Sequence, residues 1–255
     1  MRAMKAIFCV GDSHITALRD GYHARRRDGR TASFGEWREM QNARWYDGQK
    51  HVVSAEYDAE WIKVMSEVDL SAVFLCFGGG EHVLITLVNR WPFALYCPGD
   101  VPQEKAVGSG EVIPFELMHA TCASYVEMVL PLVRHLRGIT SLPMYHVLPP
   151  PPTASDDYHG RYPNEVIREL VAQFGVVPAP LRHKVWRICN AVARRMYEGL
   201  GISVIEPPAD TMDDRGYLEL RYRADDMAHG NADYGALVVD RLISIAESHE
   251  TRKTG

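Results

Sequence analysis

A serine, an aspartate and a histidine stand near the two ends of this 255-residue sequence, in an order that suits nucleophilic catalysis. Ser13 follows a short apolar run, whereas Asp226 and His229 lie three residues apart near the other end. A serine hydroxyl is a weak nucleophile until a neighbouring base takes its proton, and histidine is the commonest such base. The carboxylate of Asp226 can turn back to hold the imidazole Nδ1–H and fix its tautomer. These residue types make Ser13 a candidate nucleophile with His229 as its base.

Each of these residues also has a plainer interpretation. Ser13 can be a simple helix cap, which is the commoner role for an isolated Gly-Asp-Ser. His229 can be a polar residue in a capping loop, and Asp225 is a rival to Asp226 for orienting the imidazole. The interpretation therefore depends on whether the fold brings the three side chains together.

The elements that must position these residues alternate between apolar runs and amphipathic segments. The apolar runs predict buried strands at 5–10, 71–77, 144–148 and 202–206, and a further strand is expected around 51–54. Apolar residues at helical spacing predict helices over 15–23, 115–137, 181–200 and 231–248. Asn231 is expected to cap the last helix, and Pro131 to kink or divide the second.

This alternation indicates a mostly parallel sheet with helices on both faces, because the strands are continuous apolar runs. No linker or composition break divides the chain, so we expect one α/β domain over residues 1–255. Ligands of such sheets bind beyond the carboxyl ends of the strands. Ser13, the turn 78–82 and the segment 226–229 all fall at strand ends or in loops expected on that rim. The long segments 83–113 and 149–177 are expected to form walls of the site.

Composition and charge narrow the class of partner. The chain has 28 Lys and Arg against 33 Asp and Glu, a net charge of −5, which argues against a nucleic-acid partner. No run approaches the ~18 apolar residues of a membrane span, and the first apolar run is too short for a signal peptide. Five widely spaced cysteines without a Cys-x-x-Cys pair are typical of a reduced protein. A cytoplasmic protein that binds neither nucleic acid nor membrane is expected.

At its two ends the sequence resembles the SGNH, or GDSL-type, serine hydrolase superfamily. Gly11-Asp12-Ser13-His14 is similar to that family's nucleophile block, and Asp226-x-x-His229-x-Asn231 is similar to its terminal block. The resemblance spans about residues 5–245. It implies a flavodoxin-like, three-layer α/β/α sandwich with a mostly parallel central sheet. It also implies Ser13 as nucleophile, His229 as base, Asp226 as orienting acid, an acyl-enzyme intermediate and no cofactor.

The chain departs from the family at the oxyanion site. The family places an Asn side chain in the turn equivalent to 78–82, where this sequence has Gly80. Loss of one oxyanion donor typically lowers turnover by ~10²–10³-fold. Either the Gly80 N–H, His82 or another loop takes over this contact, or the enzyme is slow or altered. The resemblance implies the N–H of Ser13 as a second donor and suggests Gly48 as a third, although Gly48 fits a plain turn equally well.

Four residues near these blocks are expected to contact the substrate: His14, Glu81, His82 and Trp91. The Trp91 ring suits a sugar or an acyl chain, although packing of its long loop explains it equally well. Glu81 and His82 are metal-ligand types, but the sequence lacks a metal-site spacing, so no metal is expected. The triple glycine lacks the Gly-Lys-Ser/Thr ending of a phosphate-binding loop.

Three functional hypotheses follow. The first is a serine esterase that cleaves an ester, such as an O-acyl group on a sugar or small metabolite, and the two end blocks favour it. The second is a non-hydrolytic relative that binds a glycan or a protein, and Gly80 motivates it. The third is an O-acyltransferase that passes the acyl group to an acceptor hydroxyl. The expected partner is a small-molecule or glycan ester.

Overall fold

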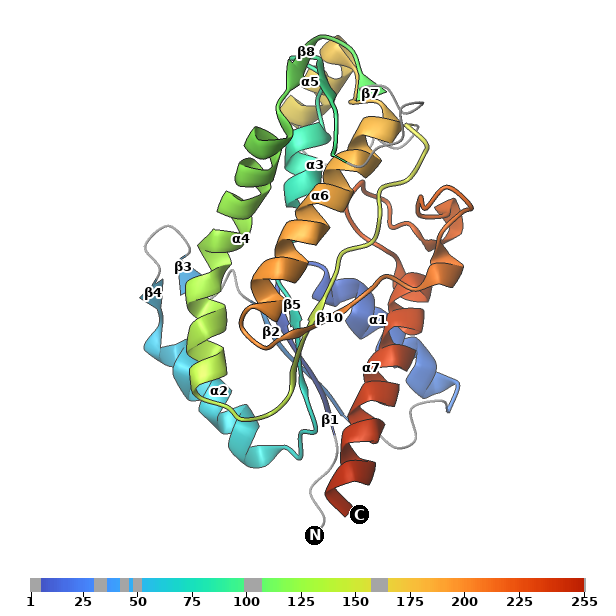
Figure 1. Ribbon diagram of the computed structural model, residues 1–255. Helices are drawn as coiled ribbons and strands as arrows, with labels where there is room; N and C mark the ends of the chain where they lie inside the picture. Colours follow the sequence, from blue (N-terminus) through green and yellow to red (C-terminus); the bar gives the residue numbers. More distant parts are fainter. Residues whose placement is uncertain are drawn as a thin grey trace.

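A five-stranded sheet in which every strand runs parallel forms the centre of the protein (Figure 1). The computed structural model describes residues 6–29, 36–41, 46–47, 52–98, 107–156 and 165–254. The strands lie in the order β10-β9-β5-β1-β2. Their bounds are β1 (Ala6–Gly11), β2 (Glu36–Gln41), β5 (Val73–Cys76), β9 (Met144–Val147) and β10 (Ser203–Ile205). Counted along the chain, these five strands lie in the flavodoxin-like order 2-1-3-4-5. The chain adds β2 on one side of β1 and β5 on the other, so the order of the strands reverses between β1 and β5.

The two faces of the sheet bury separate apolar layers. On β1, Ile7 and Cys9 point into one layer and Phe8 and Val10 into the other, as the twofold period of a strand requires. The first layer is covered by α1 (Ile15–Arg27) and α7 (Ala232–Thr254). The second is covered by α2 (Ala55–Glu67), α4 (Phe115–Gly138) and α6 (Ala179–Glu198). The predicted α/β fold with a parallel sheet and helices on both faces is confirmed.

Helices α1 and α7 lie side by side at unusually close approach (Figure 1). A Cβ on Gly21 would stand 2.2 Å from the backbone nitrogen of Ala236, and one on Gly235 would stand 1.8 Å from the carbonyl oxygen of Ala17. Only glycine fits at either position. Because Ser13 precedes α1 and His229 precedes α7, this contact brings the two ends of the sequence together.

Two predictions about secondary structure are confirmed only in part. The second strand of the sheet is β2, whereas the segment expected around 51–54 is β4 (Val52–Val53), which pairs antiparallel with β3 (Tyr46–Asp47) in a separate hairpin. Strand β2 lies at the edge of the sheet and reads EWREMQ, so it lacks the apolar run of a central strand. Helix α4 also continues through Pro131 without being divided.

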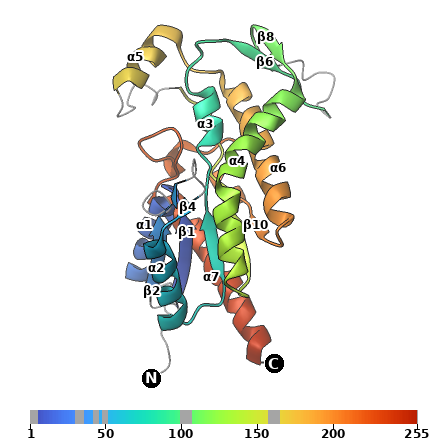
Figure 2. The same ribbon diagram turned by 90° about the vertical axis from the view of Figure 1, so that its left-hand side faces the viewer.

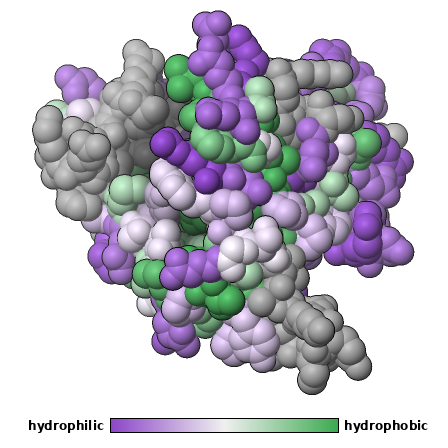
Figure 3. All heavy atoms as spheres, turned by 90° about the horizontal axis from the view of Figure 1, so that it is seen from above, coloured by the Kyte–Doolittle hydropathy of each residue, from purple (hydrophilic) through white to green (hydrophobic). Residues whose placement is uncertain are grey.

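Above the carboxyl end of the central sheet lies a small cap made from the two long segments (Figure 2). It contains α3 (Glu81–Thr86), α5 (Glu165–Phe174) and a three-stranded sheet of β6 (Phe93–Leu95), β7 (Val107–Gly108) and β8 (Glu111–Ile113). Seen from above, hydrophilic and hydrophobic residues alternate over the surface of this end (Figure 3). Its exposed apolar side chains include Leu84, Trp91, Val112 and Val166.

Two short 3₁₀ helices, η3 (Ala209–Thr211) and η4 (Leu220–Tyr222), lead from β10 to the loop before α7. Asn231 caps α7 as predicted, since its Oδ1 accepts the N–H groups of Asp233 at 3.0 Å and Tyr234 at 3.1 Å. None of the helices in the described part of the chain is long and apolar enough to cross a membrane.

Candidate active site

Ser13 lies in the turn between β1 and α1, beside the point where the strand order reverses. The backbone here is tightly held, because Asp12 donates its N–H to the carbonyl of Cys76 at 2.9 Å. A Cβ on Gly11 would meet that same carbonyl oxygen at 2.2 Å. The carboxyl end of β1 therefore packs closely against β5. Ser13 is exposed just beyond it, at the point of the sheet where ligands bind in folds of this kind.

The structure brings Ser13, His229 and Asp226 into one hydrogen-bonded chain. The Oγ of Ser13 lies 2.7 Å from Nε2 of His229, and Nδ1 of His229 lies 2.8 Å from Oδ2 of Asp226. Asp226, rather than its neighbour Asp225, contacts the imidazole. Helix α1 has no side-chain cap, so Ser13 binds His229 and does not act as the cap. The order hydroxyl, imidazole, carboxylate is the one found in Ser-His-Asp sites, and these three residues are called the triad below.

A short closed loop holds His229 and Asp226 in place. The carbonyl of His229 accepts the N–H of Ala224 at 3.0 Å, and Arg223 forms an antiparallel bridge with Gly230. The Asn231 side chain donates to the carbonyl of Arg221 at 2.7 Å, which ties the loop to η4. Residues on both sides of the loop thus restrain the imidazole.

The carboxylate of Asp226 is held in its charged form. Its Oδ1 accepts the N–H groups of Ala228 and His229, each at 2.8 Å. Burial alone would raise the pKa of Asp226, but the hydrogen bond and charge of His229, together with these N–H groups, lower it to about 2. The acid next to the imidazole is therefore ionised across the physiological range, as an orienting carboxylate must be.

The glycine turn after β5 is pinned by two carboxylates. Asp12 accepts the N–H of Gly78 at 3.1 Å, and Glu81 accepts the N–H of Gly79 at 2.5 Å. Gly78 and Gly79 have φ of 72° and 91°, values that favour glycine. In the described part of the chain, no acceptor is found for the N–H of Gly80 or of Ser13. The two N–H groups named in the oxyanion prediction are thus available to a ligand.

Gly80 itself has room for a side chain. It is the residue before α3, with φ −87° and ψ −12°, and no atom lies within 4 Å of a Cβ built on it. Gly48, the other predicted oxyanion donor, lies outside the described residues.

The residues expected to contact substrate are placed differently from one another. His14 lies beside the triad, with its ring centroid 4.6 Å from that of His229. Burial, followed by the neighbouring imidazoles of His229 and His82, lowers the pKa of His14 to about 3, so this ring is neutral at pH 7. Trp91 is 76% exposed and stacks under the guanidinium of Arg90, whose Cζ lies 4.6 Å from the Trp91 ring centroid.

Glu81 and His82 face inward. Burial raises the pKa of Glu81, and its carboxylate turns back onto the glycine turn. His82 is only 2% exposed, and burial lowers its pKa to about 3. Both side chains line a small cavity of about 20 Å³ behind the turn, with room for a single water molecule. Because α3 turns the side chains of Glu81 and His82 toward the core, both lie on the inner side of the glycine turn.

Ser13 and His229 open onto a separate surface pocket of about 470 Å³. Its polar lining side chains include Thr16, Asp20, Asp225 and Asp226, and alanine and glycine residues line the rest. Helix α3 packs against the loop that carries Asp226 and His229, since Val83 and Leu87 contact Met227. The cap therefore borders the site, as expected of the two long segments.

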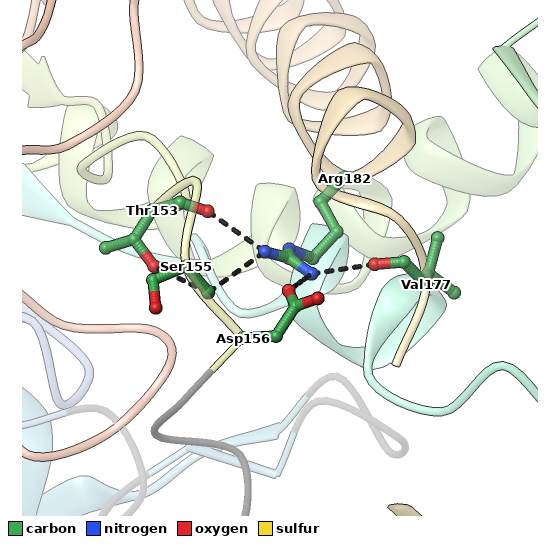
Figure 4. A network of polar contacts seen from close by, with 5 residues as sticks. All are labelled: Thr153, Ser155, Asp156, Val177 and Arg182. Atoms are coloured by element: carbon green, nitrogen blue, oxygen red, sulfur yellow. Dashed lines mark hydrogen bonds and ion pairs between the residues drawn. The ribbon is translucent and has the colours of Figure 1, made fainter. Parts of the chain in front are cut away.

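A buried arginine holds the segment that follows β9. Arg182, at the start of α6, is 3% exposed. Its guanidinium donates to the carbonyls of Val177 at 2.7 Å, Thr153 at 3.0 Å and Ser155 at 3.2 Å, and to the carboxylate of Asp156 at 2.6 Å (Figure 4). The first residues of this segment, Pro149 and Pro150, line a small apolar pocket with His14 and Gly78. Arg182 thus anchors a wall next to the triad.

Sequence reasoning missed Asp12 and Arg182. Asp12 carried a signal, because an acid beside the nucleophile can reach a neighbouring turn, but nothing in its spacing identified Gly78 as its partner. Arg182 appeared only as one polar residue in a predicted helix.

Comparison with solved structures gives several similar chains. A carbohydrate acetylesterase family member from Sinorhizobium meliloti has a TM-score of 0.48 at 14% identity, and the match covers 96% of this chain and 99% of that one. A GDSL-like lipase from Bacteroides thetaiotaomicron has a TM-score of 0.43 at 10% identity, covering 97% and 88%. An alpha/beta hydrolase enzyme from the metagenome of Lake Arreo, Spain, has a TM-score of 0.41 at 12% identity, covering 97% of both chains. No protein-family model and no curated protein sequence matches the chain.

Proposed function

We propose that this protein is a serine hydrolase that cleaves carboxylic esters through an acyl-enzyme on Ser13. The single observation that carries the proposal is the chain of contacts from Ser13 Oγ to His229 Nε2 at 2.7 Å and from His229 Nδ1 to Asp226 at 2.8 Å. A half-buried carboxylate, an imidazole and a hydroxyl in this order form the arrangement that activates a serine.

The proposed reaction has two halves. Ser13 Oγ attacks the ester carbonyl carbon while His229 Nε2 takes the hydroxyl proton, and the carbonyl oxygen becomes an oxyanion. The N–H groups of Ser13 and Gly80 donate to that oxyanion. The intermediate collapses, and the alcohol leaves with the proton from His229. Water then attacks the acyl-enzyme by the same route, which releases the acid and restores Ser13.

The pocket supports a small ester as the substrate class. Its described wall combines the polar side chains of Thr16, Asp20 and Asp225 with alanine and glycine residues, and no large apolar side chain that could hold a long acyl chain is among the described lining residues. No lysine or arginine is among its described lining residues, so an anionic substrate would meet only acidic side chains. A short O-acyl group on a neutral sugar or small metabolite fits this environment.

The test compares the wild type with Ser13→Ala and with Ser66→Ala. Ser66 is an exposed serine whose hydroxyl donates to the backbone of Lys63, far from the triad in the chain, so its variant controls for the loss of a hydroxyl. Each protein is given p-nitrophenyl acetate, and each is treated with a fluorescent phosphonate and measured by intact mass. We expect turnover and a phosphonate adduct in the wild type and Ser66→Ala, and neither in Ser13→Ala.

Two outcomes would overturn the proposal. Ester hydrolysis that persists in Ser13→Ala would place the nucleophile elsewhere. A folded wild type with no turnover and no adduct would favour the non-hydrolytic binding protein, for which the glycine at position 80 is the motive. Adding an acceptor sugar separates hydrolysis from transfer, because a transferase would consume the ester faster and yield the acylated sugar.

A further inference from the structure

Two buried cysteines face each other between α4 and α6. The Sγ atoms of Cys122 on α4 and Cys189 on α6 are 2.6 Å apart, although the residues are 67 positions apart in the sequence. Cys122 is fully buried and Cys189 is 7% exposed. Both thiols are unbonded in this structure. A disulfide bond is about 2.0 Å long, so the two sulfur atoms need only a small movement to reach bonding distance.

The pair is enclosed where α4 packs against α6. Apolar side chains of α4 and α6 pack around it in one core cluster. The hydrogen bond between the thiols and their burial raise the pKa of Cys189, so a thiolate is disfavoured there. In contrast, Cys97 is only half-buried.

We propose that Cys122 and Cys189 form a redox pair that closes into a disulfide joining α4 to α6. With hydrogen peroxide as the oxidant, one sulfur attacks a peroxide oxygen and becomes a sulfenic acid, with loss of one water. The second sulfur attacks the sulfenic sulfur, the S–S bond forms, and a second water leaves. Two thiols lose two protons and two electrons in total, and one peroxide is reduced to two waters.

The pair lies close to the proposed active site. Cys122 and Cys189 line the same small cavity as Gly78, Gly79 and Glu81, which form the turn described above. The bond would therefore tie together the two helices that back this turn. The inference itself rests on the cysteine geometry and stands whether or not the protein hydrolyses esters.

The experiment maps the cysteines after oxidation. The purified full-length chain is incubated for hours with hydrogen peroxide, and a second sample is refolded from denaturant in the presence of oxidised and reduced glutathione. Free thiols are then alkylated in denaturant, and tryptic peptides are identified by mass spectrometry. We expect a linked peptide pair containing Cys122 and Cys189, and a fall from five alkylated cysteines to three.

Variants make the assignment specific. Cys97→Ser should keep the linked peptide, whereas Cys122→Ser and the smaller change Cys189→Ala should each abolish it. The oxidised wild type should melt about 5–15 °C higher than the same protein after dithiothreitol, because the bond closes a long loop. Five alkylated cysteines in both samples, or a linked peptide that joins a different pair, would overturn the proposal. A linked Cys122–Cys189 peptide in either sample supports it.

Discussion

Replacing His146 should reduce the loss of unfolding free energy on acidification. The size of this reduction follows from the burial of the His146 imidazole. His146 and His82 are each 2% exposed, and burial lowers the pKa of each to about 3 from an ordinary value of 6.5. Because the folded-state pKa lies below the unfolded one, the unfolded chain binds protons that the folded chain does not between pH 6.5 and 3. The stability from a neutral buried histidine is therefore full above pH 6.5 and is lost as the pH falls.

The size of the effect follows from linkage. From pH 7 to pH 5, each such histidine lowers the free energy of unfolding by about 2 kcal/mol, so His82 and His146 together lower it by about 4 kcal/mol. Glu81 acts in the opposite direction, because a raised folded-state pKa favours the fold on acidification. The lowered pKa of Asp226, at about 2, acts only below pH 4. Burial also lowers the pKa of His14 and of His183. All of these contributions are common to the wild type and a His146 variant, so the difference between the two proteins isolates His146.

The suitable variant is His146→Phe, which keeps an aromatic ring stacked on Tyr197, where the ring centroids lie 3.9 Å apart. Urea unfolding followed by tryptophan fluorescence at pH 7 and pH 5 measures the free energy of unfolding. We expect the loss between the two pH values to be about 2 kcal/mol smaller in His146→Phe than in the wild type. His23→Phe, at an exposed position, serves as the matched control. An equal loss in His146→Phe and the wild type would refute a neutral, buried His146.

Three further predictions concern the site and its support. Asp226→Asn should lower kcat on p-nitrophenyl acetate by about 10³–10⁴-fold with little change in Tm, and a loss below tenfold would remove Asp226 from the catalytic arrangement. Gly80→Asn should fold normally, because a new Cβ meets no atom within 4 Å. It should raise kcat by roughly 10-fold or more, because the amide adds an oxyanion donor, and a fall in kcat would contradict this. Arg182→Met should lower the free energy of unfolding in urea by about 3 kcal/mol or more, since three backbone carbonyls and Asp156 lose their partner, and a loss below 1 kcal/mol would show that water replaces the guanidinium.

The sequence predicted the central strands because burial on both faces leaves a readable signal. The inner strands β1, β5 and β9 each coincide with an apolar run. β10 lies at the edge of the sheet and is only partly buried, but it coincides with an apolar run too. The ends of all four strands agree with the prediction to within about two residues. The edge strand β2 failed this test, since its residues Trp37, Arg38 and Glu39 are only half-buried. The hairpin at β4 is apolar enough to resemble a central strand, but two residues of pairing are too few to show which sheet they join.

The site was predictable as far as it depends on strand ends. The convergence of Ser13 with Asp226 and His229 follows from the rule that parallel strands present their carboxyl ends together. The roles of Glu81 and His82 were not predictable, because they depend on which face of the short helix α3 meets the core. The pairing of Cys122 with Cys189 likewise depends on the rotation of two long helices, which the spacing of their apolar residues gives only approximately.

Gly80 has no side-chain donor, but the turn that contains it is fixed by hydrogen bonds, and this fixes the direction of the Gly80 N–H. Asp12 and Glu81 each hold one N–H of the turn and leave the next one, that of Gly80, without an acceptor in the described part of the chain. A donor fixed before the reaction needs no reorganisation when negative charge develops, and such preorganisation is a large share of what an oxyanion site contributes. On the proposed function, loosening the turn should therefore lower kcat and leave KM nearly unchanged. Glu81→Ala, which removes one of the two carboxylates, is the variant in which that pattern should appear.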